Sequence, residues 1–389
     1  MAQTMNVPAR SPMWRGALFY FTLFGGVGSI VPFINVYFTQ MGLNGRQIGI
    51  LATFLPLFTV AASPFVSALA DSRNLRRRIL QLLAVLYAIA IFLLGFTRTF
   101  VAIVPFFIVQ AFAAGCIQPL GDGVVTSMAR RYRLNFGQMR LWGSIGVAAT
   151  GIAFGALWQR VGFGSMFLTA SLIFLLLALV SQMLDEPTGR REKVQGERPF
   201  RTLLQNRSFT ILLITGFLIG VAMGMLIVFE GIFVVSLGGG EFLVGLLIGA
   251  GATAEVPFMR LSGSLAERWG YRRTLLLGYT LFGIAVLSYS WVTLPMLLVP
   301  VAMLRGMGFG LFFPTTLKLV SELAPEAWSA TAQAMLTAVS FGLSPLIAGP
   351  VGGLILDTWG AASIFRLAGT AVFLSILVLL LNYRRLSFN

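Results

Sequence analysis

Residues 67–78 (SALADSRNLRRR) and residues 263–273 (GSLAERWGYRR) are two copies of one sequence pattern. Each copy has Leu-Ala, then an acidic residue, then a run of arginines. The acids, Asp71 and Glu267, stand 196 positions apart in a chain of 389 residues, close to half its length. A connection that was merely basic would not repeat the acid, the spacing and the Leu-Ala. The repeat therefore predicts a duplicated structural unit.

The sequence around these two connections is apolar in blocks of about twenty residues, the length that a helix needs to cross a bilayer. The chain is 57% hydrophobic and 11% charged and contains no His, too few polar residues to cover a soluble domain. The ten-residue alternation of a membrane barrel is missing. We predict an all-α integral membrane fold with twelve transmembrane helices near 16–38, 47–69, 79–96, 101–127, 139–158, 164–184, 208–236, 242–265, 274–292, 295–319, 330–356 and 363–383.

The longest polar stretch lies at the middle of the chain and is typical of a linker between two six-helix halves. We predict two pseudo-symmetric bundles with this division: an N-terminal tail at 1–15, a first bundle at 16–184, a linker at 185–207, a second bundle at 208–384 and a C-terminal tail at 385–389.

Basic residues gather in every second connection, which explains the net charge of +15. The clusters include 76–78, 130–133, 190–207 and 268–273. By the positive-inside rule these connections and both termini are cytoplasmic. The basic residues thus indicate how the chain is oriented in a cytoplasmic (inner) membrane. We expect the lipid bilayer to be a partner and expect no nucleic-acid partner.

The loop at 67–78 resembles the loop motif of the major facilitator superfamily, although Ser67 replaces the usual leading glycine, which the second copy has at Gly263. Two further segments, 136–146 and 325–333, are similar to the lactose-permease and phenylpropionate-permease branch. This resemblance implies proton symport of an oligosaccharide, nucleoside or aromatic acid, with two bundles that alternate access to a central site. It also implies that Asp71, Arg76, Arg77, Glu267 and Arg272 form the loops that switch conformation.

Few ionisable residues lie at membrane depth, where a charge near a helix centre costs about 2.5–3.5 kcal/mol. Asp122 and Arg140 fall on consecutive helices and can meet at similar depth; the resemblance implies that they pair. A purely structural salt bridge is the alternative. Trp142, beside Arg140, is a candidate to stack on a substrate ring.

Glu255 and Arg305 are expected to lie near each other in the second bundle, by the same resemblance. Arginine stays protonated, so Arg305 cannot carry a proton as His can. Whether Glu255 is a proton carrier or the ion-pair partner of Arg305 stays open. Glu230, near the outer end of the seventh span, is a further candidate, with exposure in a cavity mouth as its alternative.

The residues that an enzyme or a metal site would need are missing from the sequence. The chain has no His, a single Cys116 and no phosphate-binding loop, so we expect no enzyme activity, no disulfide, no metal and no cofactor. A channel is disfavoured because the chain carries its own duplicated halves. We predict a monomeric, proton-coupled secondary transporter for a small polar or anionic solute. The alternative is efflux of drugs or metabolites by proton antiport on the same fold. The substrate, the direction of transport and the coupling ion stay open.

Overall fold

The computed structural model describes residues 12–185, 199–325 and 328–382. Most of the predicted tails and linker, at 1–11, 186–198 and 383–389, lies outside these residues, as do residues 326–327 of the segment 325–333.

Twelve helical segments within the described residues are long and apolar enough to cross a membrane, as the apolar blocks predict. Helices suit this environment because each satisfies its backbone hydrogen bonds internally. The segments are Met13–Gln40, Gly45–Ser72, Arg76–Leu94, Phe100–Tyr132, Phe136–Val161, Phe163–Ser181, Arg207–Ser236, Glu241–Trp269, Tyr271–Trp291, Pro295–Leu323, Thr331–Trp359 and Ala361–Leu381.

The chain divides into two compact units. Unit 1 comprises Met1–Val31 and Phe58–Lys193, and unit 2 comprises Pro32–Leu57 and Val194–Asn389. Helices α1 (Met13–Gln40) and α2 (Gly45–Ala61) therefore contribute to both units. This division differs from the predicted halves, because residues 32–57 group with the C-terminal helices.

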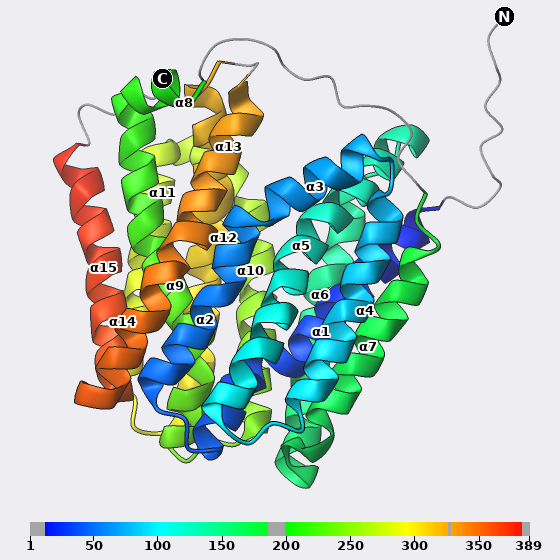
Figure 1. Ribbon diagram of the computed structural model, residues 1–389. Helices are drawn as coiled ribbons and strands as arrows, with labels where there is room; N and C mark the ends of the chain where they lie inside the picture. The colour runs from blue at the N-terminus through cyan, green and yellow to red at the C-terminus, as the bar shows by residue number, and fades with distance from the viewer. Residues whose placement is uncertain (1–11, 186–198, 326–327, 383–389) are drawn as a thin grey trace, which may run out of the picture. The chain divides into compact units, whose positions relative to one another are not determined.

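Unit 1 is a bundle of helices that run side by side (Figure 1). Its members beyond the first part of α1 are α3, α4, α5, α6 and α7. Their bounds are Ser63–Ser72, Arg76–Leu94, Phe100–Tyr132, Phe136–Val161 and Met166–Ser181. Helix α4 packs on α5 and α7. Thr150 of α6 donates a 2.9 Å hydrogen bond to the carbonyl of Gly25 on α1, which joins these two helices.

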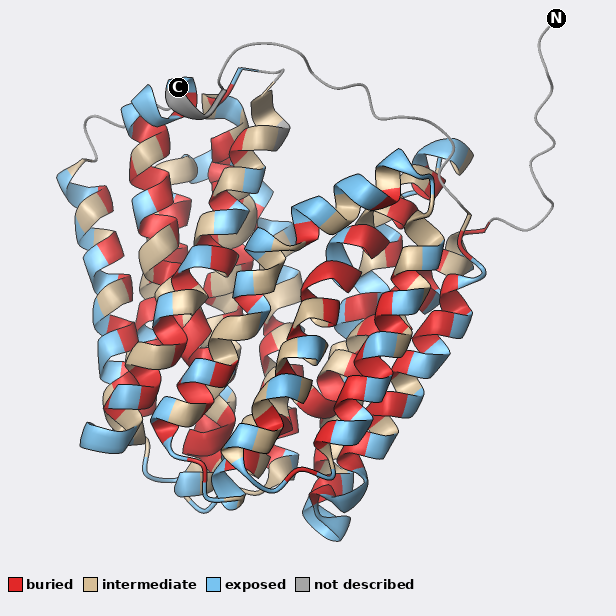
Figure 2. Cartoon of the chain, in the orientation of Figure 1, coloured by how far each residue is buried: buried red, intermediate tan, exposed pale blue. Residues whose placement is uncertain are grey.

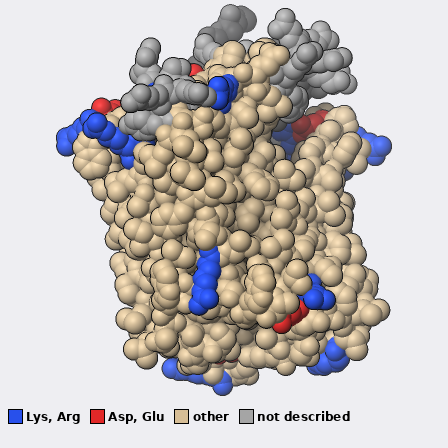
Figure 3. All heavy atoms as spheres, turned by 90° about the vertical axis from the view of Figure 1, so that its left-hand side faces the viewer, with Lys and Arg blue, Asp and Glu red and all other residues tan. Residues whose placement is uncertain are grey.

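Unit 2 is built on α9, α10, α11, α12, α14 and α15 (Figure 1). Their bounds are Arg207–Ser236, Glu241–Trp269, Tyr271–Ser288, Leu298–Leu323, Ser344–Trp359 and Ala361–Leu381. A short helix α8 (Pro199–Gln205) precedes them, and α13 (Ser329–Thr337) joins α14 through a π-helical turn at Ala338–Leu343. Buried and exposed residues alternate along each of these helices (Figure 2). The face in Figure 3 is mostly free of charged residues, as a lipid-facing surface requires.

Glycines on α12 set how closely its neighbours approach. A side chain at Gly306 would overlap the backbone of Gly251 on α10, and one at Gly308 would overlap Phe282 on α11. Small residues at such positions let membrane helices pack backbone to backbone. The glycines that follow Arg305 are thus packing positions.

Gly306→Ala is expected to destabilise unit 2 by about 1–3 kcal/mol, because the added carbon meets a backbone that cannot rotate away. The measurement is the thermal midpoint of the purified protein in detergent. Gly263→Ala on α10 is the control, since nothing lies within 4 Å of a carbon added there. Equal midpoints for the two variants would contradict this packing role.

Residues 32–57 belong to unit 2 because the start of α2 is bound to α14. Asp357 accepts hydrogen bonds from the backbone N–H groups of Gly45 (2.6 Å) and Arg46 (2.9 Å). The carboxylate therefore caps the N-terminus of α2, where the unpaired amides and the helix dipole favour negative charge. The first turns of α2 also meet α14 through glycines, Gly45 against Gly353 and Gly49 against Gly349.

Candidate functional site

The first cluster of polar side chains lies inside unit 1, on three membrane-spanning helices. Asp122 comes from α5, ten residues before its end at Tyr132 and thus about 15 Å along the helix. Arg140 lies in the second turn of α6. Tyr20, from α1, donates a 2.5 Å hydrogen bond to the Asp122 carboxylate.

Arg140 binds aromatic rings in this cluster. Its guanidinium carbon lies 4.1 Å from the ring centroid of Phe24 and 5.2 Å from that of Tyr20. Cation–π contacts of this kind stabilise a guanidinium without using its N–H groups. Gly143, one turn later on α6, provides the space for this guanidinium, because a side-chain carbon there would lie 2.7 Å from Arg140 Nη1.

The expected ion pair between Asp122 and Arg140 is not among the ion pairs that the described residues make within 4.0 Å. This corrects the geometry of the prediction, although both side chains do meet in one cluster. The reason is Tyr20, whose hydroxyl binds the carboxylate while its ring faces the guanidinium. Trp142 lies on the same helix, 43% exposed, with its ring edge-on to Phe21 at 6.4 Å.

The second cluster lies inside unit 2 and joins Glu230, Tyr289 and Arg305. Arg305 Nη1 donates to Glu230 Oε1 at 2.8 Å, and the Tyr289 hydroxyl donates to the same oxygen. The side chains of Arg305 and Glu230 are only 17% and 14% exposed. A charge-assisted pair with little solvent around it is strongly held.

Of the two alternatives for Glu255, the ion pair with Arg305 is not formed among the described residues, because Arg305 pairs with Glu230. The guanidinium passes Gly251 of α10, where an added side-chain carbon would lie 3.4 Å from Arg305 Nη2, and reaches Glu230 on α9. Glu255, one turn beyond Gly251, makes no hydrogen bond or ion pair within the described part of the chain. Arg305 still acts on it electrostatically.

Glu230→Ala is expected to destabilise the protein by roughly 3 kcal/mol, because it leaves the Arg305 guanidinium in a poorly hydrated place without its counter-charge. The thermal midpoint in detergent measures this loss. The double variant Glu230→Ala/Arg305→Leu is expected to recover most of it, since both charges are gone. A double variant as unstable as the single one would show that the pair is not the cause.

In the first of the two repeated loops, two arginines bind neighbouring groups. Arg76 binds Asp71 through an ion pair and also lies 3.5 Å from the Ser127 hydroxyl. Arg77 donates to the carbonyls of Gln182 and Leu184, just past the end of α7. In the region of the second copy, Tyr271 donates a 2.8 Å hydrogen bond to Glu322. Glu267 and Arg272 flank this tyrosine in the sequence.

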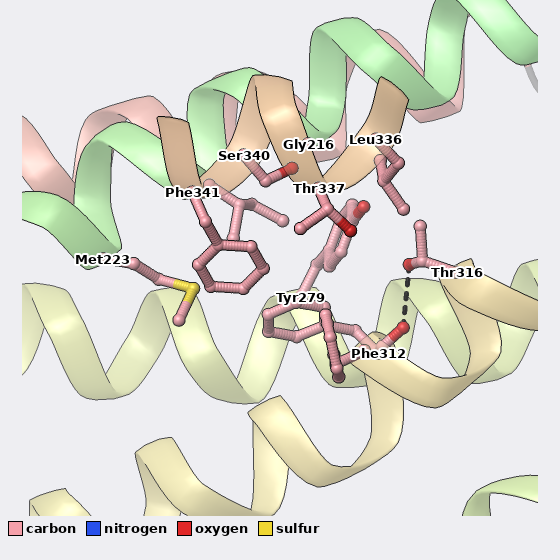
Figure 4. A pocket seen from close by; sticks show the side chains of 11 residues that line it. Gly216, Met223, Tyr279, Phe312, Thr316, Leu336, Thr337, Ser340 and Phe341 are labelled. Atoms are coloured by element: carbon pink, nitrogen blue, oxygen red, sulfur yellow. Dashed lines mark hydrogen bonds between the residues drawn. The ribbon is translucent and has the colours of Figure 1, made fainter. Parts of the chain in front are cut away.

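A small recess lies between α9, α11, α12 and the π-helical turn of unit 2 (Figure 4). Phe341 and Met223 lie at one end of it, and the Tyr279 and Phe312 rings line its floor. The Thr316 hydroxyl donates a 2.7 Å hydrogen bond to the Phe312 carbonyl. The volume of the recess is about 20 Å³, which is room for one water molecule, so no solute fits there.

Tyr20, Phe24 and Tyr289 are the cluster members that the sequence argument missed. The two tyrosines could have been signalled by their presence in apolar spans, because a phenol hydroxyl inside a bilayer needs a polar partner. Phe24 is one of 34 phenylalanines, and the sequence does not distinguish it from the others. Among the described residues no group of three His, Cys, Asp or Glu side chains could hold a metal ion.

Comparison with known proteins now adds the family. A model of the MFS_1 like family matches residues 13–367. The chain belongs to this family. It is 30% identical over 377 residues to the maltose permease of Geobacillus stearothermophilus, covering 95% of this chain and 94% of that protein. It is 25% identical over 309 residues to the multidrug resistance protein MdtG of Salmonella paratyphi A, covering 75% of each.

The fold is also shared with a solved member of the transporter class. The crystal structure of a mutant of the nucleoside transporter NupG matches with a TM-score of 0.84 and 16% identity, covering 95% of this chain and 99% of that one. The family and these relatives show that the chain is a multi-pass membrane transporter and not an enzyme. The family agrees with the resemblance to the major facilitator superfamily drawn from the loop at 67–78.

Proposed function

We propose that the chain is a monomeric secondary transporter of a cytoplasmic (inner) membrane that carries a small polar organic solute together with protons, by alternating access. The observation that carries the proposal is that each unit holds a tyrosine, a carboxylate and an arginine in one cluster on its membrane-spanning helices. Such groups are costly at membrane depth and mark solute or ion pathways.

Arg140 is the group proposed to bind the solute. Its guanidinium lies against the Phe24 ring, and its N–H groups make no hydrogen bond or ion pair within the described part of the chain. A guanidinium fork suits a carboxylate or adjacent hydroxyls. Exposed Trp142, on the same helix, offers a flat apolar surface for a sugar ring or a base. Sugars are favoured, since the maltose permease is a relative over nearly the whole chain.

Glu255 is the group proposed to carry the proton. Asp122 and Glu230 are each bound by a tyrosine hydroxyl, and Glu230 also by Arg305. Glu255 can take up and release a proton without breaking any ion pair in the described residues. This supports the proton carrier over the alternative role as partner of Arg305, which Glu230 fills.

Efflux of amphipathic drugs by proton antiport is the second candidate, and the multidrug protein MdtG supports it as a relative over three quarters of the chain. The arginine of unit 1 argues against it for cationic drugs, because like charges repel in a poorly hydrated site.

The two candidates are separated in proteoliposomes that contain the purified protein and a pH-sensitive dye. Maltose, uridine and benzoate are supplied outside, one at a time, and tetraphenylphosphonium represents cationic drugs. Solute-dependent proton entry with maltose supports sugar symport. Proton exit coupled to tetraphenylphosphonium uptake supports antiport. Saturable solute exchange that ignores the pH gradient would overturn proton coupling.

A further inference from the structure

We propose that Tyr20 is a positioning residue that keeps Asp122 from pairing with Arg140 and so leaves the Arg140 N–H groups for the solute. The inference rests on the proposed function only for the identity of the solute. The arrangement of Tyr20 between Asp122 and Arg140 does not depend on that function. Tyr20, Asp122 and Arg140 all lie within unit 1.

Opposite charges on neighbouring helices attract strongly where water is scarce. Asp122 and Arg140 nevertheless make no ion pair within 4.0 Å among those of the described residues. Tyr20 accounts for this: its hydroxyl binds Asp122 Oδ1 at 2.5 Å, and the face of its ring is 5.2 Å from the Arg140 guanidinium. Gln118, one turn before Asp122 on α5, is a further polar residue of this helix.

The guanidinium is held in place from its other sides. Phe24, one turn beyond Tyr20 on α1, lies under it at 4.1 Å, and the missing side chain at Gly143 provides its space. The Phe136 ring meets the Tyr20 ring edge-on at 6.0 Å and fixes the phenol from α6. Phe24 and Gly143 thus orient the arginine, while Tyr20 satisfies the carboxylate.

Unit 2 shows what the same three residue types do without this separation. There the tyrosine and the arginine bind one carboxylate oxygen, so the N–H groups of Arg305 are partly used by Glu230. In unit 1 the tyrosine alone takes the carboxylate. One arginine is therefore neutralised inside the protein, and the other is left available.

Phenylglyoxal, which reacts with accessible guanidinium groups, tests this without any knowledge of the solute. The full-length protein in liposomes is treated briefly, digested with chymotrypsin, and modification at Arg140 and Arg305 is quantified by mass spectrometry. In the unmodified protein Arg140 is expected to react and Arg305 to be protected. In Tyr20→Phe, Asp122 is released to bind Arg140. Modification of Arg140 is then expected to slow roughly tenfold, the effect of one added hydrogen bond to a charge.

Two further variants complete the test. Tyr20→Phe/Asp122→Asn is expected to restore Arg140 modification, because the competing carboxylate is gone. Tyr87→Phe is the matched control: Tyr87 is a buried tyrosine on α4, stacked on Phe174 at 3.6 Å, and its loss should leave Arg140 reactivity unchanged. Unaltered Arg140 modification in Tyr20→Phe overturns the proposal, whatever happens to transport.

Asp122→Asn alone keeps the proposal testable if Tyr20→Phe does not fold. Since Asp122 does not bind Arg140 in the native protein, this variant should leave Arg140 modification at the native rate. A marked increase would mean that the two charges are already paired, which overturns the proposal.

Transport gives a separate readout with radiolabelled maltose as the probe. Tyr20→Phe is expected to raise KM about tenfold with a smaller change in Vmax, because Asp122 then competes with the solute for Arg140 while the coupling step is left intact. Saturating maltose should also protect Arg140 from phenylglyoxal. If no probe is transported by the unmodified protein, the proposed sugar transport fails, while the labelling results still decide the role of Tyr20.

Discussion

Arg140→Ala is expected to lower Vmax/KM for solute uptake by about 100-fold, the cost of losing roughly 3 kcal/mol of hydrogen bonds to a charged group. Phe24 contacts the guanidinium and Gly143 leaves room for it, and neither residue occupies its N–H groups. The replacement is therefore expected to remove hydrogen bonds to the solute. Uptake of radiolabelled maltose into cells or proteoliposomes measures the effect.

The control for this variant is Arg366→Ala. Arg366 is also an arginine on a membrane-spanning helix, but it is exposed on α15 and belongs to unit 2. Its replacement should leave uptake and the amount of inserted protein close to those of the unmodified chain. Uptake above half of the native rate in Arg140→Ala, at equal expression, would remove this arginine from the mechanism.

Glu255→Gln is expected to abolish proton-driven accumulation while solute exchange across the membrane continues. Glutamine cannot release a proton, so the variant is locked in the state that resembles the protonated acid. A gradient of one pH unit stores about 1.4 kcal/mol, enough for tenfold accumulation by a one-proton symporter. The ratio of inside to outside solute should fall from about tenfold towards one, as measured in proteoliposomes with an imposed gradient.

Glu241→Gln provides the comparison, because Glu241 lies in the first turn of the same helix, where its carboxylate is 3.4 Å from the Gln40 side-chain nitrogen. This variant should accumulate solute normally. If Glu255→Gln still concentrates solute against its gradient, the proton is carried elsewhere, and Asp122 becomes the next carboxyl group to replace.

Hydropathy and loop chemistry predicted much of the architecture. The twelve apolar blocks correspond to the twelve membrane-length helices of the described residues, for example 208–236 to Arg207–Ser236 and 295–319 to Pro295–Leu323. The repeated Leu-Ala, acid and arginine pattern predicted a duplicated unit from residues a few positions apart. These features are local, since they depend on the length of an apolar run and on residues a few positions apart.

The partners of the membrane charges could not be predicted in this way. A helix in lipid is apolar on nearly every side, so the sequence shows how deep a residue lies but not which way it faces. The sequence left open whether Arg305 pairs with Glu255, and in the structure Arg305 pairs with Glu230 on α9. Asp122 and Arg140 were expected to pair, but Tyr20 from α1 takes the carboxylate.

The sequence by itself determined the class of protein, the membrane-length helices and the place of each ionisable group along its helix, because each follows from where charges interrupt apolar runs along the chain. Only the tertiary structure decided that one arginine is neutralised and the other is left with its donors available. That outcome depends on the rotation of each helix about its axis and on the glycines that let neighbours approach, neither of which hydropathy records.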